Sequence, residues 1–174
     1  MRRAPTAGSR SETTLENLAE LYRDSQPTIL GHRRGGDAHA APEQSDGVAA
    51  ERYVYMRRVH SHEDRPYCVI DIYLDAAIFA RRPARFRRDA VIPLLLAMPS
   101  VQIATARQTL TISTADLEVA RHLGVSVNAP VAEVRRIFTG PERRVIYLGE
   151  ITYRGDYVQL GDGPDGLRHG PEAR

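Results

Sequence analysis

The sequence has no lysine and no tryptophan, and its only cysteine is Cys68. A single cysteine excludes a disulfide framework and any Cys-x-x-Cys site. The longest apolar run, residues 90–98, is about half of the ~20 residues that cross a bilayer, and Pro93 interrupts it. The N-terminal charges are not followed by the apolar segment of a signal peptide. We therefore expect a cytoplasmic protein without a membrane segment, and we interpret Cys68 as a small buried hydrophobic residue.

All 24 basic side chains are arginine, and 22 acidic side chains reduce the formal net charge to +2. A dedicated nucleic-acid-binding protein normally carries a concentrated basic stripe. The nearest feature here is a local cluster, which we interpret as a solvated helix face: Arg81, Arg82, Arg85, Arg87 and Arg88. With 174 residues, the chain is long enough for one domain. Such a domain buries roughly 70% of its unfolded surface and needs no disulfide or metal to fold.

Composition divides the chain into a patterned core and two tails. Residues 1–13 lack hydrophobic periodicity, and residues 161–174 are rich in glycine and proline, so we predict that both tails are disordered. The predicted domain covers residues 14–160. Before its core we expect a helix over 15–23, a short edge strand over 28–31 and a flexible loop over 33–49.

Two β-hairpins are predicted in the core. The first joins strands 53–59 and 67–74 through a polar turn at 62–65, and the second joins strands 130–139 and 145–153 through a turn at 140–143. Short turns make both pairs antiparallel. The letters MRRVH at 56–60 also match VRRIF at 134–138, about 78 residues later. The repeat predicts an α+β fold in which an antiparallel sheet is built from two related halves, with helices on one side.

The segment between the hairpins predicts helices and one long strand. A helical section over 76–98 is interrupted near Pro83 and again at Pro93. A strand over 101–112 follows. A short helix over 115–123 is then expected, with Thr114 as its N-cap and Gly124 as its end.

Strand alternation sorts the side chains of the hairpins by face. It predicts one face with Val54, Met56, Arg58 and His60, and one with Val145, Tyr147, Gly149, Ile151 and Tyr153. A few cations and phenols among apolar side chains are typical of a small-molecule site. Arg58 has other interpretations, in which it pairs with an acid or covers the sheet with its stem. His60 and His62 lack a reliable third metal ligand, so we expect no metal.

Enzyme motifs are missing from the sequence. It contains neither the G-x-S-x-G motif of a nucleophile elbow nor a P-loop. Glycines at 161 and 163 lack the strand and helix that a dinucleotide site needs. The residues alone therefore predict no reaction and no cofactor.

Three segments, in their order, resemble those of a UTRA domain: RRVHSHEDRPYCVIDIYLD, QTLTISTADLEVARHLGVSVNAPVAEVRRIF and VIYLGEITYRGDYVQL. The similarity covers about residues 14–160. It implies a six-stranded antiparallel sheet with helices, the fold shared with chorismate lyase, and usually a homodimer. It also implies an effector-binding domain of a GntR/HutC-type transcriptional regulator. In that family a winged helix-turn-helix precedes this domain and binds DNA. Only 13 residues precede the first expected helix, so we expect DNA binding only through a domain absent from this chain.

The resemblance also implies ligand-binding positions. In the sugar-phosphate-binding members of that family, two arginines of an Arg-x-Arg strand bind the phosphate, and their positions correspond to Arg58 and the titratable His60. Two hydroxyl-bearing positions on the central helix correspond to Ala90 and Ile92, which lack hydroxyls. Two sugar-binding glutamates correspond to Ile70 and Tyr147, and the closing tyrosine is kept as Tyr153. The expected site is therefore Arg58, His60, Ile70, Ile92, Tyr147 and Tyr153. We expect a less polar effector than a phosphosugar, with one carboxylate, because a buried phosphate would lack its partners.

Two alternatives remain open at this point. One is an enzyme of the chorismate lyase class. Tyr147 stands where that class has an acidic residue, and the nearby Glu150 is expected on the opposite face of the strand. The other is a dimerisation module that has lost its ligand. Neither alternative is our first expectation, which is an effector-sensing domain without catalysis.

Overall fold

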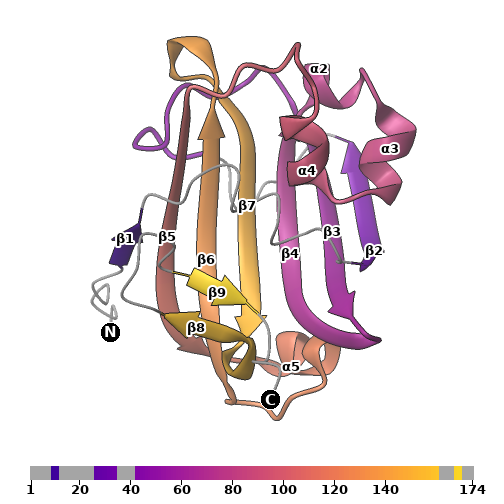
Figure 1. The fold of residues 1–174 in the computed structure, drawn as a ribbon, viewed down its shortest axis with the longest axis vertical. Coiled ribbons are helices and arrows are strands. Elements are labelled where there is room, and N and C mark those ends of the chain that lie inside the picture. The colour runs from indigo at the N-terminus through magenta and orange to yellow at the C-terminus, as the bar shows by residue number, and fades with distance from the viewer. Residues whose placement is uncertain (1–8, 12–25, 35–41, 161–166, 170–174) are drawn as a thin grey trace.

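An antiparallel sheet forms the body of the protein (Figure 1). The computed structural model describes residues 9–11, 26–34, 42–160 and 167–169. The strand order is β1-β5-β6-β7-β4-β3-β2, and every neighbouring pair is antiparallel. The six long strands are β2 (Gln26–Arg34), β3 (Tyr53–His62), β4 (Arg65–Asp75), β5 (Thr105–Thr114), β6 (Pro130–Thr139) and β7 (Val145–Arg154). The predicted six-stranded α+β fold is confirmed, and the three-residue β1 (Ser9–Ser11) extends one edge.

Both predicted hairpins are present. Strands β3 and β4 are joined at Glu63 and Asp64, whose φ values are +48° and +60°. Two consecutive residues of positive φ make the turn that matches the twist of a two-residue hairpin. Strands β6 and β7 are joined by the short 3₁₀ helix η1 (Pro141–Arg143). The central β4–β7 pair then joins the two hairpins into one sheet.

Short helices replace the single interrupted helical section. They are α2 (Ala76–Phe79), α3 (Pro83–Arg88) and α4 (Val91–Leu96). Pro83 begins α3, where a missing N–H is tolerated. Asp75 caps α2 by accepting a hydrogen bond from the N–H of Ala77 at 2.8 Å. The breaks at Pro83 and Asp89 turn the chain so that α2 to α4 pack on one face of the sheet (Figure 1).

The inner face, which we define as the face under α2 to α4, contains the main core. Its members include Met56, Ile72 and Leu74 from the sheet together with Phe86 and Leu95 from the helices. The expectation that the helices lie on one side of the sheet was wrong for one of them, because α5 (Leu117–Leu123) packs over one end of the opposite, outer face. A second small cluster on the outer face contains Tyr73, Ile137, Val145 and Leu148.

Several local predictions need correction. Asp116, and not Thr114, caps α5 by accepting from the N–H of Val119 at 2.8 Å, because a carboxylate there reaches the free N–H groups of the first turn. Val145 packs on the outer face and not beside Tyr147, because a register shift near Thr139 inserts one residue into β7. The strand predicted over 101–112 begins and ends later, as β5.

The tails contain two short strands that we did not expect. Ser9–Ser11 forms β1 along the edge strand β5, whose outer N–H and C=O groups offer pairing sites. Leu167–His169 forms β9, which pairs with β8 (Val158–Leu160). The edge strand expected over 28–31 is present within the longer β2. The helix expected over 15–23 lies outside the described residues.

Candidate functional site

The expected site residues all lie on the inner face or on the helix above it. Arg58 and His60 project from β3, Ile70 from β4, Tyr147 and Tyr153 from β7, and Ile92 from α4. All six are buried, with exposed fractions of 2% or less. Their four hydrophobic or phenolic members, Ile70, Ile92, Tyr147 and Tyr153, belong to one core cluster. The fold therefore places together residues that are up to 95 positions apart in the sequence.

Arg58 is directed from the sheet to the end of helix α3. Its Nη1 donates to the carbonyl oxygen of Asp89 at 2.7 Å, and its Nη2 donates to the carbonyl oxygen of Phe86. The guanidinium thus takes up carbonyls that a helix end leaves without partners. Burial lowers the pKa of Arg58 to about 10, against the opposing influence of Tyr147 and Asp89. Arg58 remains charged at neutral pH, and none of the described carboxylates pairs with it.

His60 is an uncharged polar group rather than a second cation. Burial, together with the positive charge of Arg58, lowers the pKa of its imidazole to about 3. On the neighbouring strand β4, Cys68 lies opposite His60. Its thiol is fully buried, and this burial raises the pKa of the thiol. The expected titratable imidazole is therefore neutral at physiological pH. It offers one donor and one acceptor to its surroundings.

An aromatic cluster beside His60 was not predicted. The ring of Tyr67 meets His60 edge-on at 6.2 Å between centroids, and it stacks on Tyr157 at 4.7 Å and on Tyr153 at 6.4 Å. Alternation would place Tyr67 and Cys68 on opposite faces. A register shift after His60 puts both in the inner core. Pro66, which is tolerated at bulges, was the only signal of this in the sequence.

A second buried arginine was also missed as a site residue. Arg136 of β6 is 2% exposed, and its Nε and Nη2 both donate to Oε1 of Gln108, at 3.3 and 3.0 Å. It lies opposite Gly149 on the neighbouring strand. Because Gly149 has no side chain, the ring of Tyr147 packs over this position. The matching letters at 56–60 and 134–138 were a usable signal, because they make Arg136 the counterpart of Arg58.

The chemistry of this region suits recognition. Two cations and several phenols lie among apolar side chains on a rigid sheet, which is the usual composition of a site that orients a small ligand. Across the described residues, no three His, Cys, Asp or Glu side chains gather closely enough to hold a metal ion. Among the helices described, none is long and apolar enough to cross a membrane.

Comparisons with known proteins agree with this architecture. The family model of the UTRA domain matches residues 40–159. No curated protein matches the chain. Among solved structures, the ligand-binding domain of a protein assigned to the GntR family of transcriptional regulators, from Bordetella bronchiseptica, is similar with a TM-score of 0.60 and 20% identity. The alignment covers 86% of this chain and 91% of that one.

Two further structures show the same fold. The effector domain of PhnF from Mycobacterium smegmatis has a TM-score of 0.63 and 16% identity, with 84% of this chain and 93% of that chain covered. The C-terminal domain of the histidine utilization repressor from Pseudomonas syringae has a TM-score of 0.58 and 15% identity, with 80% and 97% covered.

Proposed function

Because the chain belongs to the UTRA domain family, we propose that it binds a small-molecule effector on the inner face of its sheet, as the sensing domain of a GntR/HutC-type regulator. The observation that carries this proposal is the convergence of Arg58, His60, Tyr147 and Tyr153 on one buried face under α3 and α4. In small-molecule sites, a few precisely placed polar groups fix the orientation of the ligand. The solved domains named above as ligand-binding or effector domains share this fold.

The effector that we propose is less polar than a phosphosugar and carries one carboxylate. Arg58 is the cation at the position that the family resemblance assigns to phosphate binding, and two backbone carbonyls already engage it. His60 contributes no positive charge near neutral pH. Ala90 and Ile92 offer no hydroxyl. The free energy lost when a dianionic phosphate is dehydrated would exceed what these partners supply. One carboxylate needs fewer donors, and Nε of Arg58 is a buried N–H group without a hydrogen-bond partner among the described residues.

Thermal denaturation of the full chain against a library of small metabolites tests this proposal. A ligand that binds only the folded state raises the melting temperature. We expect aromatic or aliphatic monocarboxylates to raise it and hexosamine phosphates to leave it unchanged.

Tyr153→Phe removes one hydroxyl from the site and should reduce the ligand-induced rise. The matched control Tyr73→Phe removes a hydroxyl from the outer face and should keep it. A rise with hexosamine phosphate but with no monocarboxylate would contradict the proposed effector class.

Ligand sensing without turnover is part of the proposal. Chorismate lyase activity is the enzymatic alternative, and incubation with chorismate followed by detection of 4-hydroxybenzoate separates the two. We expect no product above the uncatalysed background. Tyr147 supports this expectation, since it places a buried phenol where the lyase class has an acid.

The proposed active form is a homodimer. The effector would act by favouring one arrangement of the two copies, and any such shift is limited by the difference in its affinity for the two states. Sedimentation velocity of the full chain should give a dimer at micromolar concentration. A monomer at these concentrations would contradict this part of the proposal and leave the effector prediction standing.

A further inference from the structure

A basic surface lies apart from the proposed effector site. We define the arginine patch as Arg81, Arg82, Arg85, Arg87 and Arg88, all within or beside α3. Asp89 is the only acidic residue between positions 76 and 114. This concentration of charge contrasts with the net charge of the chain, which is only +2. The patch is therefore a local concentration of positive charge and not a consequence of a basic overall composition.

Most of the patch is open to solvent. Arg81, Arg82, Arg85 and Arg88 are exposed, and the side chain of Arg88 reaches 77%. Asp89 accepts from Nε of Arg85 and from Nε of Arg88, both at 2.8 Å. One carboxylate thus serves two guanidinium groups. Arg82 makes no ion pair with any described residue. The patch keeps several positive charges beyond those that Asp89 offsets.

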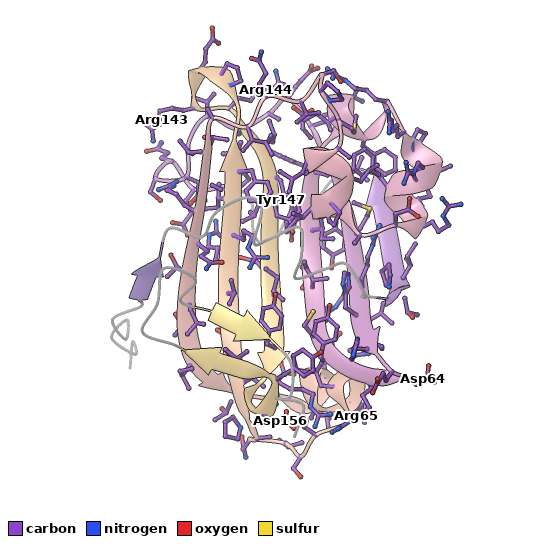
Figure 2. All side chains as sticks on the ribbon, viewed as in Figure 1. Asp64, Arg65, Arg143, Arg144, Tyr147 and Asp156 are labelled. Carbon is purple, nitrogen blue, oxygen red and sulfur yellow. The ribbon has the colours of Figure 1, made fainter. Side chains whose placement is uncertain are left out.

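The fold extends the patch along one end of the sheet. Strand β3 begins beside the end of β4, since Tyr53 pairs with Asp75, and Arg52 precedes it. Arg144, between β6 and β7, pairs with Asp75 through Nη2 and Oδ2 at 3.0 Å. Arg143 and Arg144 lie at the end that carries α2 and α3, while Asp64 and Asp156 lie at the other end (Figures 1 and 2). Glu51, Glu142 and Asp46 are acidic exceptions at the arginine end, and Asp46 precedes the segment whose Val48 N–H donates to the carbonyl of Arg143.

The composition of the patch favours a polyanion over a folded protein partner. Protein interfaces have an apolar centre. The described large hydrophobic residues that are exposed are Ile29, Leu30, Val48, Ile112, Leu117 and Val127, and none lies between positions 76 and 104. Exposed apolar side chains near the patch therefore lie only at its borders, with Ile29 and Leu30 on β2, which α3 contacts, and Val48 beside Arg144. On α3 itself the exposed charged side chains are arginines, which match a partner whose affinity comes from phosphate charge. We propose that the arginine patch docks on the phosphate backbone of duplex DNA without reading its sequence.

The spacing of the patch suits this partner. Arg85 and Arg88 lie three residues apart on α3, so they are about 4.5 Å apart along the helix axis and occupy neighbouring positions of its surface, and Arg82 is the residue that precedes the helix. Duplex DNA offers one negative charge per ~1.7 Å of its axis. Each guanidinium group can donate two parallel hydrogen bonds to the oxygens of one phosphate. The patch adds DNA contacts within this chain, which differs from the expectation that DNA binding belongs to a separate domain.

Fluorescence anisotropy with a labelled duplex of arbitrary sequence tests the proposal on the full chain. We expect binding at about 20 mM salt that weakens steeply by 200 mM. The double variant Arg82→Ser, Arg88→Ser should weaken low-salt binding at least tenfold. It should also reduce the slope of log affinity against log salt by about 1.8, at ~0.9 for each lost contact. The variants are compared only after circular dichroism shows equal helix and strand content.

The matched control is Arg65→Ser, Arg121→Ser, which removes the same charge from exposed positions at the other end. This control should bind like the wild type. The proposal is overturned if the wild type fails to bind duplex at low salt, or if both double variants lose affinity equally. It is also overturned if poly-glutamate displaces the duplex at equal charge concentration, since that points to an acidic protein partner. None of these results bears on effector binding, which is measured separately.

Discussion

The two hairpins of the sheet share a sequence pattern and a register shift, but different residues surround the shared positions. Both carry an arginine pair, Arg57–Arg58 in β3 and Arg135–Arg136 in β6, and both have a register shift two residues after it. In each hairpin the first arginine faces a carboxylate on the outer face and the second is buried on the inner face. The residues around the buried arginines then differ, with Ile70 opposite Arg58 and Gly149 opposite Arg136.

The outer faces differ in how tightly their ions are held. Arg135 bonds Asp46 and Glu150, both at 2.6 Å, and Asp46 is nearly buried. Arg57 contacts Asp71 at 3.6 Å and the exposed Glu118 at 3.1 Å. Burial raises the pKa of Glu150, against the effect of Arg135. A repeated backbone plan thus supports a structural ion pair in one half and a loose one in the other.

The largest expected effect comes from replacing Arg58. In Arg58→Met, the buried carbonyl of Phe86 and the partly buried carbonyl of Asp89 lose their charged donor. We expect a loss of about 3 kcal/mol in the free energy of unfolding, measured by urea denaturation. Arg58→Lys keeps a charge but not the fork, so it should lose roughly half as much. Wild-type stability in Arg58→Met would show that the arginine does not support α3.

His60 is compared with Phe138, its counterpart in the second hairpin. The pKa of His60 is about 3 in the folded protein and near 6.5 when unfolded, so the unfolded chain binds more protons between these values. Stability must then fall as the pH falls below about 6.5. His60→Phe removes this dependence. Between pH 7 and pH 4.5 we expect the wild type to lose about 2 kcal/mol more than the variant. Parallel stability curves would contradict a neutral buried His60.

The two outer ion pairs give a direct contrast between the halves. Arg135→Ala leaves the nearly buried Asp46 without its cation and should cost about 2 kcal/mol. Arg57→Ala breaks longer and more exposed contacts and should cost less than about 1 kcal/mol. Denaturation of both variants under the same salt checks the difference. Equal losses would show that burial of the carboxylate does not set the strength of these pairs.

Gly149 gives a smaller effect than Arg58, His60 or Arg135. A Cβ at this position would approach the Tyr147 hydroxyl oxygen to 2.5 Å. The ring must therefore shift, and we expect Gly149→Ala to cost about 1 kcal/mol. The control is Ile70→Val in the first hairpin, which removes one methyl group from a packed site and should cost a similar amount. No change in Gly149→Ala would mean that Tyr147 moves freely.

The sequence predicted the hairpins and the face of Arg58, because alternation and turn chemistry act over a few residues. It did not predict the position of Tyr67 or Val145. A bulge moves the following side chains to the other face of the sheet, and it leaves no strong signal in the local sequence. It also missed the engagement of Arg58 by the end of α3, which lies 28 residues away. Contacts of this kind depend on how helices pack on the sheet. The roles of the six expected site residues stay predictions.

Hydrogen exchange of the full chain, with and without the metabolite that raises its melting temperature most, tests the central claim most directly. A ligand on the inner face should slow exchange in β3, in α3 and α4, and in β7, while leaving α5 unchanged. Protection confined to α5 and the outer face, or no protection in any strand, would contradict an effector site beside Arg58 and Tyr153.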